Sequence, residues 1–412
     1  MHQFVTLKLG HWRQFQSIDL DLARQTTVLT GANGCGKTTI LNVLSHHFGW
    51  NVNFVSTPFM GGKRRKKFFS DIRALFKDEQ SGREGGVEVG ELKYSNGAVA
   101  KLHTPAGNSD NPQYQLNYQN KQQVVGMHIP SHRPAITYQQ ISQVPTNPKT
   151  NQQHYQEFQQ LLLQTYGSAN VRNPGLVLKQ SLISLALFGS GNDFVQENVE
   201  YRELFEGFQE ILSILLPESI GFRKIEIRMP DVVLVTDSGD FALDAMSGGI
   251  SSLFGIAWQI HMYGADKVAC TVIIDEPENH LHPSMQRTLL PSLEKAFPKY
   301  RFIIATHSPF IVTSNPEANV FGLMHNNNRQ VVSEHLEQAD LAGTPDRVLR
   351  EILDVPTTIP VWVEKEIRNV LRKYADHPDN EEKIRAIYSE FQSLGVGDSL
   401  VGFFGDDRRG GK

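Results

Sequence analysis

Hydrophobic and polar positions alternate near the start of the chain, and this alternation predicts β-strands. Two such segments precede a third predicted strand at 26–30, which runs into a glycine cluster. A hairpin follows at 87–103, where an Asn-Gly pair between two β-prone arms predicts a type I′ turn. Segments 114–119 and 124–129 are expected to extend that sheet. The N-terminal part therefore predicts an antiparallel β-subdomain.

The spacing of hydrophobic residues changes in the second half of the chain, where short apolar runs alternate with segments of helical periodicity. Strands at 268–274 and 301–305 flank a helix at 283–297, and a further helix at 250–263 precedes them. Such alternation is typical of a parallel sheet. The chain is therefore predicted to have an α/β fold.

The remaining segments differ from this core in composition. A stretch rich in glutamine and asparagine leads into helices and predicts a polar, mostly helical insert, and two amphipathic helices predict a short helical C-terminal tail. The predicted regions are a split core at 1–56 and 222–335, a β-rich subdomain with a basic loop at 57–136, the insert at 137–221 and the tail at 336–412.

Charge and cysteine content narrow the function classes. Forty basic and 44 acidic residues give a net charge of −4, which excludes the global positive field of a nucleic-acid coat protein. Two cysteines are too few for a disulfide scaffold, and no apolar run is long enough to span a membrane. We therefore expect a cytoplasmic protein without a membrane partner. Nucleic acid could still contact a local basic run, which is otherwise a solvated loop: Lys63, Arg64, Arg65, Lys66 and Lys67.

The glycine cluster at 31–38 fits the phosphate-loop pattern G-x-x-x-x-G-K-[ST] without a mismatch. It follows an apolar strand and opens an apolar helix, so backbone N–H groups and the helix N-terminus converge on one anion. Lys37 is expected to reach the β- and γ-phosphates of ATP, and the Thr38 hydroxyl is expected to ligate Mg²⁺. A glycine turn that only caps a structural helix is the alternative. The residues expected to contact the nucleotide are Asn33, Gly34, Cys35, Gly36, Lys37, Thr38 and Thr39.

Two adjacent acids follow the apolar strand at 268–274. Asp275 is expected to hold Mg²⁺, and Glu276 is expected to polarise the water that attacks the γ-phosphate. An exposed acidic turn is the alternative. Just beyond them, Glu278, His280 and His282 could form a metal cluster, but a loop that contacts a second subunit is favoured.

Four elements in chain order resemble the ATP-binding-cassette (ABC) superfamily of ATPases: the phosphate loop, a signature-like Met-Ser-Gly-Gly at 246–249, the acidic pair and a strand-end histidine. The resemblance implies an ABC ATPase head of the P-loop NTPase fold, with ATP and Mg²⁺ sandwiched between two head-to-tail subunits of a homodimer. Ser247, Gly248 and Gly249 of one chain would then meet the nucleotide of its partner. They begin a helix whose positive end can meet a phosphate, although a serine N-cap is the plainer alternative.

Within the superfamily, the segment 275–283 is similar to the OLD-type and RecF/SMC-like soluble branch, in which Leu-His-Pro follows the acids. The resemblance implies that His307 is the switch histidine, placed to donate a hydrogen bond to the γ-phosphate. It also implies that Arg13 approaches phosphate. A magnesium-sensing glutamine is expected after a core strand, and Gln139 and Gln140 remain open candidates.

Two function classes remain. The resemblance to ATPase subunits of the Septu and retron-linked anti-phage systems implies a soluble ATPase whose closure regulates a separate effector, expected to be a nuclease. The alternative is a DNA-repair or chromosome-maintenance ATPase that binds DNA in an ATP-dependent way. The segment between Thr39 and Ser247 lacks sustained heptads, so long coiled-coil arms are not expected. The tail is predicted to be mostly helical, and its acidic pair Asp406-Asp407 lies in a glycine-rich segment, so a Toprim nuclease is not expected in this chain.

Overall fold

The computed structural model describes residues 2–60, 66–69, 86–105, 112–133, 136–165, 173–337, 345–353, 355, 360–375, 377 and 381–393. The chain divides into two compact units, Met1–Val348 and Leu349–Lys412, and each is described by itself.

The strands of the first unit are β1 (Phe4–Trp12), β2 (Phe15–Asp21), β3 (Thr26–Gly31), β4 (Phe54–Val55), β5 (Thr57–Met60), β6 (Lys66–Phe69), β7 (Glu88–Tyr94), β8 (Val99–His103), β9 (Gln113–Tyr114), β10 (Asn117–Gln119), β11 (Gly126–Ile129), β12 (Phe222–Arg228), β13 (Asp231–Thr236), β14 (Phe241–Ala242), β15 (Cys270–Asp275), β16 (Tyr300–Ala305), β17 (Asn319–His325) and β18 (Val331–Leu336).

The helices are α1 (Lys37–Ser45), α2 (Asn151–Thr165), α3 (Pro174–Gly189), α4 (Val199–Leu215), α5 (Gly248–Gly264), α6 (Pro283–Ala296), α7 (Pro309–Val312), α9 (Pro345–Glu351), α10 (Val361–Lys373) and α11 (Glu381–Ser393). Short 3-10 turns occur at η1 (His46–Phe48), η3 (Glu218–Ile220) and η4 (Leu243–Ala245).

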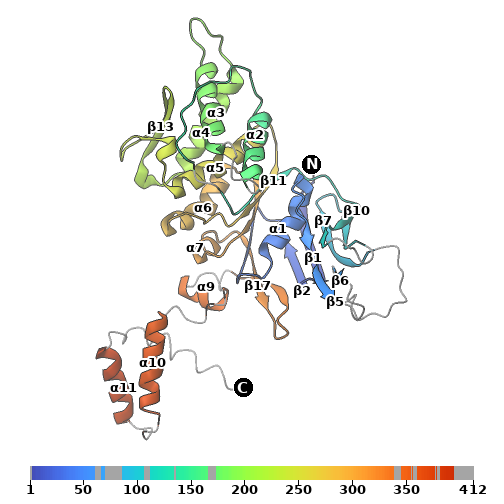
Figure 1. The fold of residues 1–412 in the computed structure, drawn as a ribbon, viewed down its shortest axis with the longest axis vertical. Coiled ribbons are helices and arrows are strands. Elements are labelled where there is room, and N and C mark those ends of the chain that lie inside the picture. Colours follow the sequence, from blue (N-terminus) through green and yellow to red (C-terminus); the bar gives the residue numbers. More distant parts are fainter. Residues whose placement is uncertain are drawn as a thin grey trace. The chain divides into compact units, whose positions relative to one another are not determined.

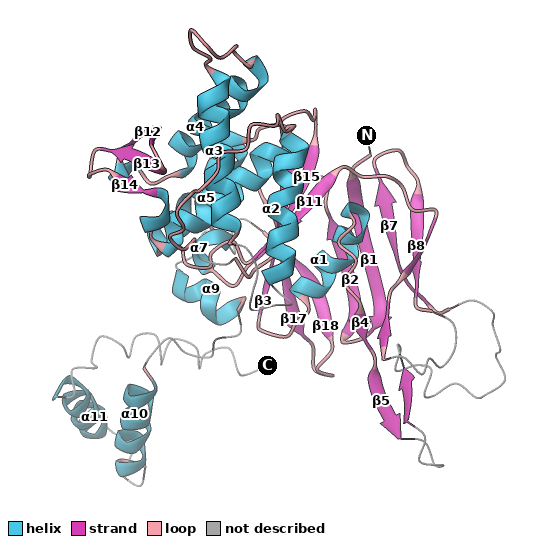
Figure 2. Cartoon of the chain, turned by 45° about the horizontal axis from the view of Figure 1, so that its top comes forward, coloured by secondary structure: helices cyan, strands magenta, loops and turns pink. Residues whose placement is uncertain are grey.

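One large sheet organises the first unit, and eleven of the described strands belong to it in the order β10-β8-β7-β1-β2-β18-β17-β3-β16-β15-β11. The strands β17, β3, β16, β15 and β11 are parallel neighbours, whereas β10, β8, β7, β1 and β2 are antiparallel. Figures 1 and 2 show α2 to α5 gathered beside the parallel end of the sheet and the antiparallel strands at the other end, with α1 lying between. The predicted α/β fold is confirmed.

The parallel strands form the centre of the core. Every residue of β3 and of β15 is buried, which explains why neither strand alternates apolar and polar residues, because a strand covered on both faces has no solvent-facing side. Their carboxyl ends lie at the same edge of the sheet, where open α/β sheets bind ligands.

Segment 124–129 was expected to extend the antiparallel sheet, and this is wrong. Its strand, β11, pairs in parallel with β15, with Gly126 opposite Thr271 and Ile129 opposite Ile274. The error arose because a short apolar run does not specify its partner strand. A strand of the core sheet therefore lies inside the predicted β-rich subdomain at 57–136, and the other predicted region boundaries stay predictions.

The hairpin of β7 and β8 forms, but its turn is not type I′. A type I′ turn needs positive φ at both central residues, whereas Gly97 has a φ of 82° and Asn96 is absent from the residues of positive φ in the described chain. The N–H of Gly97 donates to the carbonyl of Tyr94, and the N–H of Tyr94 donates to the carbonyl of Ala98. This pattern is a three-residue loop with glycine in the left-handed position.

The predicted insert is helical and packs on α5. Phe208 of α4 makes edge-to-face contacts with Phe254 and Trp258 of α5, at ring distances of 5.0 and 5.2 Å. All three rings are fully buried. Aromatic pairs of this geometry add to the burial of their area, so α5 is firmly held against the insert.

The second unit contains the amphipathic helices α10 and α11. Their apolar faces meet in a small cluster formed by Val363, Ile367, Val370 and Phe391. Across the part of the chain that the structure describes, no helix is both long and apolar enough to cross a membrane.

Candidate nucleotide site

The phosphate loop joins β3 to α1 and is shaped by glycines with positive φ. Gly31, Gly34 and Gly36 have φ values of 142°, 83° and 96°, which glycine adopts without a steric penalty. A Cβ atom on Gly36 would lie 2.5 Å from Cζ of Phe15, and one on Gly31 would lie 2.4 Å from the carbonyl oxygen of Leu323. The loop therefore depends on glycine for space as well as conformation. The N-terminus of α1 follows it directly, as an anion site requires.

Lys37 is buried inside this loop. Its ammonium group donates hydrogen bonds to the carbonyl oxygens of Gly31 at 2.8 Å and Ala32 at 3.2 Å, and Nδ1 of His307 lies 3.2 Å away. Burial lowers the pKa of Lys37, although the neighbouring Cys35 opposes this effect. The group that the sequence assigned to phosphate contact thus lies at the centre of the loop.

Thr38 and Asp275 lie 237 positions apart in the chain, and the Thr38 hydroxyl donates to Oδ2 of Asp275 at 2.9 Å. Asp275 is 4% exposed, and its other oxygen, Oδ1, is buried with no hydrogen-bond partner among the described residues. Burial raises the pKa of Asp275 to about 6, although the hydrogen bond from Thr38 works against the rise. A cation would supply the missing partner, and hydroxyl and carboxylate oxygens are ligands that Mg²⁺ accepts. The residues present fit this ion.

Glu276 follows β15 in a left-handed conformation, with a φ of 46°. Its N–H donates to the carbonyl of Ala305 at 2.8 Å, which ties it to the end of β16. One carboxylate oxygen accepts a hydrogen bond from Asn279 Nδ2 at 3.1 Å, and the other lies 3.4 Å from Nε2 of His307. Backbone and side chain are therefore both fixed beside the phosphate loop.

His307 lies between Lys37 and Glu276. Because an ammonium group can only donate, Nδ1 of His307 accepts from Lys37, and the ring proton is placed on Nε2, facing Glu276. Burial and the charge of Lys37 lower the pKa of His307, so the ring is neutral at pH 7. The structure thus brings together five of the predicted site residues: Lys37, Thr38, Asp275, Glu276 and His307.

Sequence reasoning missed the role of Glu278. Its Oε1 accepts hydrogen bonds from the Thr306 hydroxyl at 2.7 Å and from the His307 N–H at 2.6 Å, and burial raises its pKa. Glu278 therefore anchors the backbone of His307. A metal cluster with His280 and His282 is not formed: the described residues contain no group of three His, Cys, Asp or Glu side chains that could hold a metal ion.

The signature-like segment lies at the start of α5. Ser247 caps this helix by accepting a long hydrogen bond, 3.5 Å, from the N–H of Ile250, and Ser247 and Gly248 are exposed. A Cβ atom on Gly249 would lie 2.9 Å from the carbonyl oxygen of His280, so the glycine lets the loop after the acidic pair pass close to the helix. Ser247 and Gly248 thus offer an exposed helix tip beside that loop, whereas Gly249 is buried.

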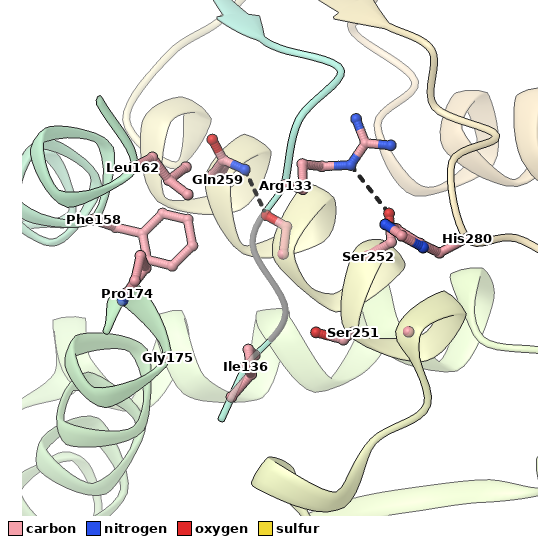
Figure 3. A pocket seen from close by; sticks show the side chains of 12 residues that line it. Arg133, Ile136, Phe158, Leu162, Pro174, Gly175, Ser251, Ser252, Gln259 and His280 are labelled. Atoms are coloured by element: carbon pink, nitrogen blue, oxygen red, sulfur yellow. Dashed lines mark hydrogen bonds between the residues drawn. The ribbon is translucent and has the colours of Figure 1, made fainter. Parts of the chain in front are cut away.

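Arg133 is a second residue that sequence reasoning did not single out. It follows β11, is 9% exposed, and its guanidinium bonds to Ser252 of α5 and to the backbone of both acids of the pair. Figure 3 shows it beside a cavity of about 100 Å³, with Phe158 and Leu162 on the opposite wall. The available signal was a basic residue directly after a core strand.

Lys179 of α3 was also missed, because a lysine in an amphipathic helix is normally solvated. Its side chain is fully buried and pairs with Asp244 at 2.5 Å and Asp231 at 2.6 Å. Burial opposes its charge, but the hydrogen bonds that the ammonium donates to both carboxylates outweigh burial and raise the pKa of Lys179. Asp244 lies three positions before Ser247, so this ion pair ties the insert to the signature segment.

Arg13 and its neighbour Gln14 form the turn between β1 and β2. The Gln14 amide donates to the carbonyl of Gly34 at 3.3 Å, so the turn touches the phosphate loop. The Arg13 guanidinium lies over the ring of Phe54, 5.8 Å from its centre. The turn therefore places Arg13 near the loop without a hydrogen bond of its own to it among the described contacts.

The other predicted residues are less closely placed. Gln139 and Gln140 are exposed, and the carbonyl of Gln139 accepts from Lys179, so neither is assigned as a magnesium sensor. Cys35 is buried, and Asn33 is exposed in the loop. Within the basic run, residues 63–65 lie outside the described residues and 66–67 begin β6, so nucleic-acid contact there stays a prediction.

Two family comparisons cover most of the first unit. A family described as "AAA domain" matches residues 6–218, which is more than half of the chain. A second AAA-domain family, whose description also names the AbiEii toxin of a type IV toxin–antitoxin system, matches residues 192–313. Together the two matches include the phosphate loop, the signature segment, the acidic pair and His307.

Individual proteins that the chain is similar to include two retron ATPases and a Septu protein. The chain is 29% identical over 112 residues to the retron Ec83 probable ATPase of Escherichia coli, a match that covers 24% of this chain and 21% of that protein. It is 49% identical over 43 residues to the retron Vc95 probable ATPase of Vibrio cholerae, covering 10% and 8%. The Septu protein PtuA of Bacillus thuringiensis matches at 21% identity, over 93% of this chain and 91% of that protein. The chain thus spans about a fifth or less of the retron ATPases but almost all of PtuA.

Solved structures similar to the chain include heads of SMC proteins. The head domain from Thermotoga maritima has a TM-score of 0.40 at 13% identity, covering 81% of this chain and 99% of that one. The head from Pyrococcus furiosus, bound to the C-terminal domain of ScpA, has a TM-score of 0.44 at 12% identity, covering 85% and 100%.

Proposed function

The chain belongs to the AAA-domain family, and from that premise we propose that it is a Mg²⁺-dependent ATPase that hydrolyses ATP between two head-to-tail subunits. The observation that carries the proposal is the convergence of Lys37, Thr38, Asp275, Glu276 and His307 at one edge of the sheet. These groups come from the ends of three neighbouring parallel strands, β3, β15 and β16, and the ligand side of an α/β sheet is at such ends.

Each group has a distinct task in the proposed reaction. Lys37 leaves the carbonyls of Gly31 and Ala32 and contacts the phosphates of ATP. Thr38 and Asp275 hold Mg²⁺, which when bound neutralises phosphate charge.

Glu276 orients the attacking water and takes its proton. The water oxygen bonds to the γ-phosphorus as the bond from that phosphorus to the bridging oxygen breaks, and ADP leaves with that oxygen. His307 turns its Nε2–H from Glu276 toward the γ-phosphate, which frees the carboxylate to act as a base.

In the proposed dimer, the second subunit contributes the N-terminal tip of α5, the signature helix. Ser247 and Gly248 are exposed, and none of the described hydrogen bonds joins Ser247 to the phosphate loop of its own chain. The N-terminus of α5, which carries Gly249 and the capping serine, can bind an anion supplied from outside. This supports a homodimer in which each signature tip contacts the triphosphate held by its partner.

Mixing two inactive variants tests whether each nucleotide site is shared between the two subunits. Lys37→Ala is expected to lose ATP binding, and Ser247→Arg is expected to bind ATP but hydrolyse it poorly, because the arginine blocks the partner's site. A heterodimer of the two contains one intact composite site, and about half of the dimers in an equimolar mixture are heterodimers, so the mixture is expected to recover up to about a quarter of the wild-type rate. Each variant mixed with itself is the control, and a mixture that stays as inactive as the controls refutes assembly in trans.

We further propose that closure of this dimer regulates a separate effector protein, expected to be a nuclease, in anti-phage defence. The similarity to Septu PtuA along almost the whole chain and to two retron ATPases supports this role. The test is phage plating on cells that carry the chain with its neighbouring genes. Lys37→Ala is expected to abolish protection while the protein remains folded; protection that is unchanged in this variant contradicts the proposal.

A further inference from the structure

Arg133 links the acidic pair to the signature helix α5 through hydrogen bonds. Its Nη2 donates to the carbonyl of Glu276 at 2.8 Å and its Nη1 to the carbonyl of Asp275 at 3.3 Å. Its Nε donates to the Ser252 hydroxyl at 3.1 Å, and Nη1 also donates to the carbonyl of Pro130 at 2.9 Å. A guanidinium fits this task because its donors form a rigid planar fork. One side chain therefore touches the acidic pair and the signature helix at once.

At one end, the segment that carries Arg133 fixes the proposed base. Glu276 has a positive φ, a conformation that a non-glycine residue keeps when its surroundings hold it. Arg133 binds the carbonyl of that strained residue. Asn279 donates to the Glu276 carboxylate and also to the carbonyl of Ser131, both at 3.1 Å. Hydrogen bonds from Arg133 and through Asn279 thus connect both the backbone and the side chain of Glu276 to residues 130–133.

At the other end, Ser252 lies one helical turn after Gly248. It is 5% exposed and belongs to the same rigid helix whose aromatic residues pack on the insert. A displacement of the helix tip therefore moves Ser252. In Figure 3 the dashed line from the guanidinium ends at Ser252, whereas the neighbouring Ser251 points away from it.

We propose that Arg133 is a positioning residue that couples the two nucleotide sites of the dimer. The inference rests on the proposed function, in which the signature tip of one chain contacts the nucleotide held by the other. When that contact fixes the helix, Ser252 and Arg133 fix the backbone of Glu276 in the first chain's own site. Each site thus hydrolyses ATP fastest when its neighbour is filled, and hydrolysis is cooperative in ATP.

Ser252→Ala is the selective test, because it removes the link to the helix and leaves the bonds from Arg133 to the acidic pair. The rate of phosphate release is measured against ATP concentration. For the wild type we expect a Hill coefficient that approaches about two, the limit for two sites. Ser252→Ala is expected to lower it to about one, whereas the control Ser251→Ala is expected to keep the wild-type value.

Arg133→Lys supplies a second, independent readout. A single ammonium group cannot replace the fork, so kcat is expected to fall by roughly 10- to 100-fold, the effect of losing a charged hydrogen bond or two in the transition state. The dissociation constant of ATP is expected to stay unchanged. Amide hydrogen exchange of residues 276–279 is expected to rise in Arg133→Lys but not in Ser251→Ala.

The outcomes separate this inference from the function on which it rests. If the wild type neither hydrolyses ATP nor dimerises with it, the proposed function fails. If the wild type is an active dimer but its Hill coefficient is about one, or if Ser252→Ala stays as cooperative as the wild type, the coupling role of Arg133 is refuted and the ATPase assignment stands.

Discussion

Replacing Lys179 by methionine is a direct test of how the helical insert is tied to the signature segment. The substitution keeps most of the volume of the side chain and removes its charge. Lys179 is fully buried, and the side chain of its partner Asp244 is 3% exposed, so Lys179→Met leaves Asp244 buried without its counter-ion. The side chain of Asp231, in contrast, is 30% exposed and keeps access to water.

The magnitude follows from this difference in burial. Breaking a buried ion pair by removing one partner costs about 3–5 kcal/mol, and we expect Lys179→Met to destabilise the insert by that amount. Asp231→Asn is expected to cost about 1 kcal/mol or less, since Asp244 still balances the lysine. The pKa of Lys179 is raised above its ordinary value of 10.5, so the side chain is charged at every pH below 10.5. The stabilisation is therefore fully present at pH 7 and is lost only as the pH rises through the pKa of the folded state.

Hydrogen-exchange mass spectrometry of peptides from α3 and α5 measures the local opening free energy. Lys179→Met is expected to increase exchange in both helices, and adding Asp244→Asn is expected to recover part of the loss, because the double variant no longer contains an unpaired buried charge. Turnover is expected to fall with the opening of α5. A loss below about 1 kcal/mol in Lys179→Met, or losses that simply add in the double variant, would refute this reasoning.

Three further expectations concern the nucleotide site. Gly36→Ala adds a Cβ atom 2.5 Å from Phe15 at a φ of 96°. This substitution is expected to lower ATP affinity at least about tenfold, as measured by calorimetry. Gly34→Ala is expected to lower the affinity less, because its Cβ atom meets no atom within 4 Å. The pKa of Asp275 is raised from 3.8 to about 6, so without nucleotide the chain is expected to lose about 3 kcal/mol of stability as the pH rises through that interval. Asp275→Asn is expected to abolish this pH dependence in unfolding experiments; an unchanged dependence contradicts it.

Local patterns predicted several residues that the structure places together at one edge of the sheet. The phosphate loop is contiguous in sequence, and its glycines are required by the backbone itself. Asp275 follows a strand buried on both faces, so its position at the ligand edge of a parallel sheet could be inferred from periodicity alone. These predictions needed no knowledge of distant contacts.

Pairing between distant segments could not be predicted in the same way. β11 is too short for its sequence to choose between the antiparallel strands and β15. Arg133 acquires its role from residues 119 to 143 positions away, and Lys179 from two acids in later segments. In each case the role of the charged side chain depends on its burial and on its hydrogen-bond or ion-pair partners in the folded chain. Residue type alone does not specify these partners.

The central claim is that two copies of the chain share their nucleotides through the signature helix tips. The most direct measurement is a cryo-EM or crystal structure of Glu276→Gln with ATP and Mg²⁺, in which hydrolysis is expected to be blocked and the closed dimer trapped. We predict that Ser247 and the N–H groups of Gly248 and Gly249 of one subunit contact the γ-phosphate bound at Lys37 of the other. A structure in which ATP occupies the phosphate loop while both signature tips lie away from every nucleotide would contradict the account.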